Sequence, residues 1–327
     1  MERMMKIVYH GIYASLLTEF IDFKRHCGFK YSTESKIFLL FDRLTIDKKE
    51  DKIGISRDLA DIWSVKRDNE SEAYRYKRCI TLNQFSLHLN RMGIESAMAQ
   101  APKPKKNFTP HIYTQKELDT ILDVCDNLRC DFIKRDSLYM VMPVLVRFLS
   151  ATGVRIGEAL DLKINDINLI YNYLVLSDTK NGKERLLPFT QSLSVALKQY
   201  AKHRDRLNPP KEDGYFFLTA RGRKCNPEQI YKVFRKILDK AKIPFKGGHY
   251  GPRVHDLRHT FAVKSLVSMA ENGMDIYCSL PVLSTYLGHQ SMEATNQYVR
   301  LTAEQHPGLM HNLEAVFINV FPSLKEI

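Results

Sequence analysis

Residues 164–189, INDINLIYNYLVLSDTKNGKERLLPF, carry the pattern that decides the fold of the C-terminal part of this chain. β-Branched, aromatic and other apolar residues alternate with polar ones along the stretch, which is typical of strands, and Asn181-Gly182 is a strong signal for a tight hairpin turn. Helical periodicity flanks the stretch on both sides. The sequence therefore predicts a small antiparallel β-sheet inside a domain that is otherwise helical.

The rest of the chain divides into a helical domain, a linker and this second domain. Residues 1–97 contain four segments with apolar residues three and four apart, which predicts a small helical bundle. Residues 98–113 include three prolines and three lysines among small residues, a composition that resists helix formation. Thr114 and Glu117 then form a capping box that opens a domain spanning residues 114–327.

The charge of the chain favours a polyanionic partner. Lysine and arginine number 49 against 37 acidic residues, so the net charge is +12 at neutral pH. Nucleic acid is the first expectation and an anionic membrane surface the second, while solvated cationic faces are the plain alternative. The linker is either a simple tether or a cationic strap that lies against phosphates; its lysines are Lys103, Lys105 and Lys106.

The cysteines and the apolar segments indicate a protein of the cytoplasm with no membrane partner. The six cysteines form no CxxC pair, which is typical of a reducing compartment. The N-terminus lacks the apolar core of a signal peptide, and the most apolar stretch is short and contains Pro143 and Arg147.

The first candidate functional motif is ATGVRIGEAL, residues 151–160. Arg155 opens a short helix, and Glu158 lies three residues on, where its carboxylate can hold the guanidinium in a fixed pose. Such a pair is usually a surface salt bridge worth little. The residues on both sides of this motif are apolar, which predicts that Arg155 is partly buried. Its guanidinium group then needs an anionic partner besides Glu158.

The second motif is HDLRH, residues 255–259. His255 and Arg258 share one face near the start of a helix, where backbone amides already favour an anion, so a phosphate grip is plausible. The alternatives are an arginine on a solvated face and a zinc site formed by His255 and His259. Zinc is disfavoured because Asp256 stands where the zinc motif needs glutamate, and the apolar residues that follow indicate that His259 faces the protein interior.

Two lysines, Lys180 and Lys183, flank the tip of the predicted hairpin. A lysine at such a tip is normally solvated. A hairpin can also deliver an ammonium group into a cleft, where it can donate a proton to a leaving oxygen.

The segment LGHQSMEATNQYVR, residues 287–300, predicts a helix, a tight turn and a second helix. Gly288 is a helix stop and Ser291 an N-cap. His289 and Tyr298, one on each side of the turn, have no special meaning when taken alone.

Together these motifs resemble the signature of the tyrosine recombinases, also called phage integrases. The resemblance covers residues from about 114 to 305, and more loosely the N-terminal helices, which are similar to the core-binding domain of the family. Several short motifs in the right order are far more specific than any one of them. The matching residues are Arg155, Lys180, His255, Arg258, His289 and Tyr298.

The resemblance implies the fold and the chemistry. The fold is mostly α-helical, with a core-binding domain followed by a catalytic domain that contains a small antiparallel sheet. Tyr298 is then the nucleophile that forms a 3′-phosphotyrosyl link, while Arg155, Arg258 and His289 bind the phosphate oxygens. Glu158 orients Arg155.

The proton transfers fall to two other residues under the same resemblance. His255 is the candidate base, and Lys180 is the candidate acid for the leaving 5′-oxygen. The covalent link conserves the ester bond, so no ATP is needed, and neither a metal nor another cofactor is expected.

The implied partners are double-stranded DNA with paired core sites and three further copies of the chain, with accessory proteins as an option. The layout resembles Xer-type or transposon-encoded enzymes, so a role in DNA integration, transposition or another movement of a mobile element is implied, and the resemblance leaves integration, excision, transposition and dimer resolution open as the outcome. The apolar tail after Pro307 either closes its own core or docks in trans on a neighbouring copy. The alternatives are a catalytically idle DNA-binding or architectural protein and a relaxing enzyme similar to type IB topoisomerases.

Overall fold

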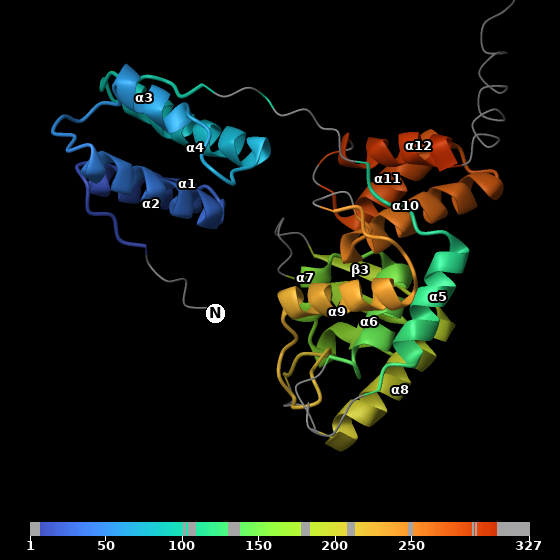
Figure 1. The fold of residues 1–327 in the computed structure, drawn as a ribbon. Helices are drawn as coiled ribbons and strands as arrows, with labels where there is room; N and C mark the ends of the chain where they lie inside the picture. The colour runs from blue at the N-terminus through green and yellow to red at the C-terminus, as the bar shows by residue number, and fades with distance from the viewer. Residues whose placement is uncertain are drawn as a thin grey trace, which may run out of the picture. The chain divides into compact units, whose positions relative to one another are not determined.

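The computed structural model describes residues 7–100, 103, 109–129, 138–177, 184–207, 213–247, 251–289, 291 and 293–305. The chain folds into two compact units, Met1–Asn107 and Phe108–Ile327 (Figure 1). The division lies within the segment for which the sequence predicts a linker. The chain is mostly helical with a small antiparallel sheet, which confirms the predicted fold class.

The first unit packs its helices around an aromatic core. Phe20, Phe38 and Phe85 meet at ring-centroid distances of 5.5 to 5.9 Å, and all three side chains are almost fully buried. Tilted and edge-on rings of this kind interact favourably beyond the area they bury. The helices are α1 (Ala14–His26), α2 (Ser32–Asp47), α3 (Arg57–Ser64) and α4 (Glu72–Arg91).

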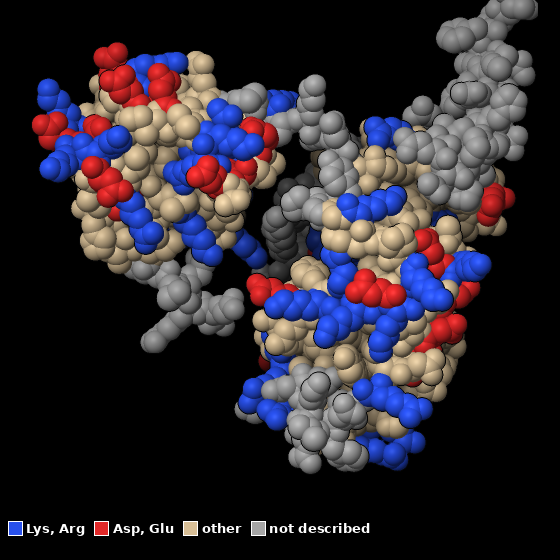
Figure 2. Space-filling model, viewed as in Figure 1, with Lys and Arg blue, Asp and Glu red and all other residues tan. Residues whose placement is uncertain are grey.

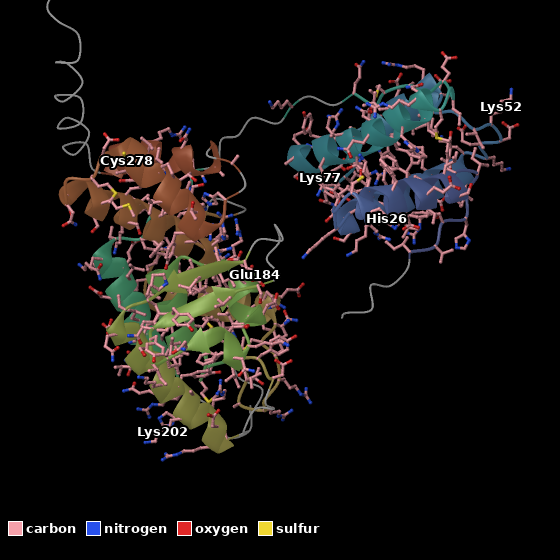
Figure 3. The ribbon with its side chains drawn as sticks, turned by 180° about the vertical axis from the view of Figure 1, so that it is seen from behind. His26, Lys52, Lys77, Glu184, Lys202 and Cys278 are labelled. Carbon is pink, nitrogen blue, oxygen red and sulfur yellow. The ribbon has the colours of Figure 1, made fainter. Side chains whose placement is uncertain are left out.

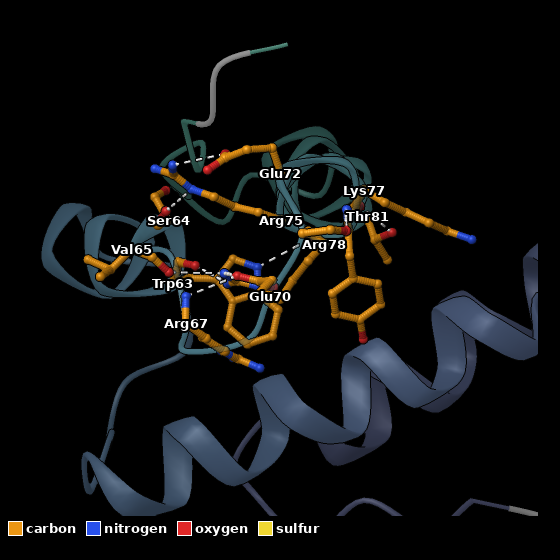
Figure 4. Close-up of polar contacts among 12 residues, drawn as sticks. Trp63, Ser64, Val65, Arg67, Glu70, Glu72, Arg75, Lys77, Arg78 and Thr81 are labelled. Carbon is orange, nitrogen blue, oxygen red and sulfur yellow. Dashed lines mark hydrogen bonds and ion pairs between the residues drawn. The ribbon is translucent and has the colours of Figure 1, made fainter. Parts of the chain in front are cut away.

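A buried ion pair joins α4 to the segment that follows α3 (Figure 4). The Arg78 side chain is 0% exposed, and its Nε donates to Glu70 Oε1 at 2.8 Å. The same guanidinium donates to the carbonyl of Val65 at 3.0 Å and to that of Trp63, and it lies 4.7 Å from the Trp63 ring centroid. A buried charge of this kind is tolerated because each nitrogen of the guanidinium donates to an acceptor.

The first helix of the second unit begins with the capping box that the sequence predicts. The Thr114 hydroxyl accepts from the Glu117 N–H at 3.2 Å, and the Glu117 carboxylate accepts from the Thr114 N–H at 2.7 Å. Helix α8 was not predicted from the sequence. The helices are α5 (Gln115–Asp126), α6 (Met142–Thr152), α7 (Ile156–Asp161), the 3-10 turn η1 (Ile164–Asp166), α8 (Gln191–Leu207), α9 (Pro227–Lys240), α10 (Val254–Glu271), α11 (Ile276–Leu287) and α12 (Glu293–Gln305).

The predicted sheet consists of β1 (Ile167–Asn168), β2 (Tyr173–Leu176) and β3 (Arg185–Pro188), in that order and antiparallel. Leu174 pairs with Leu187, and both side chains are fully buried. Side chains two residues apart on a strand share a face, so Arg185 lies on the same face of the sheet as Leu187. The hairpin tip, with Asn181-Gly182, lies outside the described residues.

Helix α10 is the central element of the second unit. It packs against α6 on one side and against α11 and α12 on the other (Figure 1). Because of this position, its N-terminal half lies beside the ends of both α6 and α11. In the part of the chain that the structure describes, no helix is long and apolar enough to cross a membrane.

Candidate active site

Arg155 and Glu158 are held together at the start of α7. Arg155 Nη1 donates to Glu158 Oε1 at 2.8 Å, and the Arg155 backbone N–H donates to Glu158 Oε2 at 3.0 Å. Arg155 Nη2 also donates to the carbonyl of Gly288 at 3.3 Å. The Arg155 side chain is 29% exposed and that of Glu158 is 8% exposed. One edge of the guanidinium is therefore fixed by the protein, and another part still faces solvent.

Arg258 is buried at the centre of the same region. Its Nη1 and Nη2 each donate at 2.8 Å, to the carbonyl of Gly153 at the end of α6 and to that of Leu287 at the end of α11. Burial, followed by the charge of Arg155, lowers the pKa of Arg258 to about 10. The guanidinium therefore remains charged at neutral pH and keeps these two helix ends at a fixed separation.

Tyr298 on α12 points into this cluster. Its side chain is 1% exposed, and its hydroxyl lies 3.1 Å from His259 Nδ1. The His289 ring stacks on it with a centroid distance of 6.0 Å and an interplanar angle of 16°. Burial raises the pKa of Tyr298, and the charges of Arg258 and Arg155 offset only part of that rise. The phenol is therefore neutral at pH 7.

His255 and His259 lie one turn apart on α10, with ring centroids 4.9 Å apart. The His255 residue is exposed, but the protein atoms packed around the ring partly desolvate it. This desolvation, and then the charges of Arg258 and Arg253, lower the pKa of His255 to about 4. His259 is buried, as the sequence predicts, and is the imidazole that contacts Tyr298.

His289 follows the end of α11 and is held by α12. Its Nδ1 lies 2.7 Å from the Thr295 hydroxyl. Burial, followed by the charges of Arg258 and Arg155, lowers the pKa of His289 to about 4. The ring is therefore neutral at pH 7 and can donate one N–H to a ligand.

These histidines make the stability of the second unit depend on pH. The pKa is lowered to about 3 for His259 and to about 4 for His289, whereas an unfolded histidine titrates near 6.5. Between these values the unfolded chain binds more protons than the folded one, so the free energy of unfolding must fall as the pH drops from about 6.5 to about 4. We expect urea unfolding at pH 7 and pH 5 to show this loss.

A His259→Asn/His289→Asn double variant is the matched test of that dependence. Its free energy of unfolding should change less between pH 7 and pH 5 than that of the wild type. An unchanged slope would show that other groups cause the pH dependence.

The structure brings six of the proposed site residues into one region. Lys103 is exposed. The residues brought together are Arg155, Glu158, His255, Arg258, His289 and Tyr298. The residues that lie outside the described part of the chain are Lys105, Lys106, Lys180 and Lys183.

Two residues of the site were not proposed from the sequence. His259 contacts Tyr298, and Arg185 Nη2 donates to Glu158 Oε2 at 2.8 Å. The apolar residues after His259 indicated that it points inward, although not toward which partner. The strand alternation that buries Leu187 also buries Arg185. A charged residue on the buried face of a strand is unusual, and this signal could have identified Arg185 from the sequence.

Comparisons with known proteins identify the family of this chain. A model of the phage integrase family matches residues 111–305. The tyrosine recombinase XerC of Oceanobacillus iheyensis is 27% identical over 300 residues, which cover 89% of this chain and 85% of that protein. The tyrosine recombinase XerA of Pyrococcus furiosus is 30% identical over 213 residues, which cover 64% of each chain.

A solved structure shows the same fold. It is the crystal structure of the XerH site-specific recombinase bound to a palindromic difH substrate, as a post-cleavage complex. The TM-score is 0.60 at 21% identity, over 84% of this chain and 76% of XerH.

Proposed function

This chain belongs to the phage integrase family and is a tyrosine recombinase, a site-specific enzyme that cleaves and rejoins DNA strands, and we propose that the cluster around Tyr298 is its active site. The observation that carries the proposal is the position of Tyr298, whose hydroxyl lies in the region formed by Arg258, His259 and His289.

The arginines supply the positive charge that phosphoryl transfer requires. Arg155, Arg185 and Arg258 provide three guanidinium groups, and Glu158 is the carboxylate that pairs with two of them. Negative charge builds up on the non-bridging oxygens in the transition state, so preorganised donors stabilise it more than the ground state. Arg155 and Arg258 are the proposed phosphate ligands, with His289 as a further N–H donor.

The proposed reaction exchanges one phosphate ester for another. The Tyr298 oxygen bonds to phosphorus, the bond from phosphorus to the 5′-oxygen breaks, and the 5′-oxygen takes up a proton. His255 is the proposed acceptor of the phenol proton. Since the hydroxyl contacts His259, it must leave that contact before His255 can serve as the base.

The leaving 5′-oxygen needs a proton donor, and Lys180 is the proposed one. Figure 3 labels Glu184, which is the first described residue after the hairpin tip. Arg185 follows it and contacts Glu158. Strand β3, which follows the segment that contains Lys180 in the sequence, therefore begins next to the proposed site, which supports this role.

The finer biological function is also a proposal. We expect the enzyme to act as a tetramer on paired core sites in the cytoplasm, with integration or transposition as the outcome and accessory proteins as an option. Lys and Arg side chains gather across the face of the second unit seen in Figure 2, which supports contact with DNA phosphates. The tail after Pro307, proposed to dock in trans, lies outside the described residues.

The test of the proposed function uses plasmids that carry either one or two copies of the core site, taken from repeated sequences flanking the gene. A recombinase yields recombinant products from paired sites. Relaxation of supercoils without recombinants would instead identify a topoisomerase-like relaxer, and binding without either product would identify an idle DNA-binding protein.

The linker lysines should contribute phosphate contacts, and the salt dependence of DNA binding measures how many. Removal of one phosphate contact lowers the slope of log affinity against log salt by about 1, so replacing Lys103, Lys105 and Lys106 by serine should lower it by about 2 to 3. Filter binding between about 50 and 200 mM salt measures this slope. Substitution of Lys198 and Lys202, exposed residues on α8, is the control. An unchanged slope in the linker variant would identify the linker as a simple tether.

A further inference from the structure

We propose that Arg185 is a positioning residue for strand cleavage, which fixes both Glu158 and the turn before His289 and thereby sets the pose of Arg155. The proposal rests on the function proposed above. Arg185 lies at the first position of β3, and its side chain is only 10% exposed.

The first link runs through the carboxylate of Glu158. Glu158 Oε1 accepts from Arg155 Nη1 at 2.8 Å, while Oε2 accepts both from the Arg155 N–H at 3.0 Å and from Arg185 Nη2 at 2.8 Å. Burial raises the pKa of Glu158, but the hydrogen bonds from Arg155 and Arg185 and the charge of Arg185 hold it below its usual value. The carboxylate is therefore ionised, and Arg185 restricts its rotation. A fixed Glu158 in turn fixes the guanidinium of Arg155.

The second link is steric and runs to Gly288. A Cβ added to Gly288 would lie 2.5 Å from Arg185 Nη1, so the guanidinium lies directly against the backbone of this turn. Arg155 donates to the carbonyl of Gly288 at 3.3 Å, and Arg258 donates to that of Leu287 at 2.8 Å. Arginines from three separate elements thus converge on the two residues before His289.

A contribution to stability alone does not explain why an arginine is buried at position 185. Its Nε is buried and has no hydrogen-bond partner among the residues that the structure describes. A buried donor without a partner costs about 1–3 kcal/mol, and burying a second cation beside Arg155 adds repulsion. Its charge also acts on neighbouring groups, because it contributes to the lowered pKa of His289 after burial, Arg258 and Arg155. Such a residue is better explained by the geometry it imposes on the site.

The test compares Arg185→Met with Arg147→Met. Methionine keeps much of the length and packing of the side chain but removes the charge and the bond to Glu158. Arg147 forms a 2.6 Å ion pair with Asp126 in the same unit, so it controls for the loss of an arginine ion pair. With a nicked suicide duplex, Arg185→Met should slow covalent adduct formation roughly 10–100-fold, as expected for one hydrogen bond between charged groups. Arg147→Met should cleave like the wild type, and both should bind DNA normally.

A duplex with a methylphosphonate at the scissile position separates positioning from a general structural effect. The methyl group replaces a charged oxygen, so less positive charge is needed and the pose of Arg155 matters less. We expect the deficit of Arg185→Met to shrink to within about threefold on this substrate. An equal deficit on both substrates, or wild-type cleavage of the phosphodiester, would overturn the proposal.

Two further outcomes are distinguishable. If the wild type forms no adduct on either substrate, the proposed function fails and the role of Arg185 fails with it. If Arg185→Met unfolds, Arg185→Lys takes its place, since lysine keeps the charge and one donor for Glu158. The lysine variant should show the same dependence on substrate with a smaller deficit, and equal deficits on both substrates would again count against the proposal.

Discussion

Replacing Arg258 by alanine is expected to lower the rate of strand cleavage roughly 10³-fold, which makes it one of the two most damaging single changes in the chain. The side chain is 3% exposed, so its charge acts where water screens it little. Alanine removes this charge from the position proposed for the phosphate. It also leaves the carbonyls of Gly153 and Leu287 without their donor.

Arg258→Lys separates the two effects. Lysine restores the charge but cannot donate to both carbonyls in the geometry of a guanidinium fork. We expect it to bind DNA like the wild type and to cleave at a rate between those of the alanine variant and the wild type. The measurement is single-turnover adduct formation at saturating protein, with thermal unfolding recorded in parallel. Cleavage by a folded Arg258→Ala protein within about tenfold of the wild-type rate would exclude the proposed phosphate contact.

Replacing Tyr298 by phenylalanine is expected to abolish the covalent adduct completely while DNA binding is retained. The change removes only the hydroxyl, and the ring keeps its stacking on His289. Without the hydrogen bond to His259, the free energy of unfolding should fall by about 1 kcal/mol, too little to unfold the domain. Loss of activity can then be assigned to loss of the nucleophile.

Tyr286→Phe is the matched control for that change. Tyr286 lies on α11 near the site, and its hydroxyl donates to the carbonyl of Pro188 at 3.4 Å. It is not the proposed nucleophile, so its variant should form adduct at close to the wild-type rate. Adduct formation by Tyr298→Phe, or its loss in Tyr286→Phe, would redirect the assignment of the nucleophile.

Much of the fold could be predicted because the signals are local. Alternation around Asn181-Gly182 predicts the hairpin, and Thr114 with Glu117 predicts the start of α5, since both patterns depend on neighbours within a few residues. Helix α8 was missed although its periodic residues are also local. The order of the six motif residues was sufficient to indicate the family, and the contact between Arg155 and Glu158 follows from their spacing on one helical turn.

Contacts between distant segments could not be predicted in the same way. His259 and Tyr298 are 39 residues apart, and Glu158 and Arg185 are 27 residues apart, so the packing of whole elements decides whether they meet. The lowered pKa of His289 has the same origin, because burial and the charges of Arg258 and Arg155 on other segments cause it. Sequence periodicity shows which side of an element is buried, but not which side chain it meets there.

The assignment of Tyr298 as the nucleophile is best tested by locating the covalent bond between the protein and DNA. A nicked suicide duplex lets the short 5′-hydroxyl fragment diffuse away after cleavage, so the intermediate accumulates and can be digested and analysed by tandem mass spectrometry. We expect a nucleotide attached through its 3′-phosphate to the oxygen of Tyr298. Attachment to any other residue, or cleavage of the duplex without a covalent adduct, would contradict the assignment.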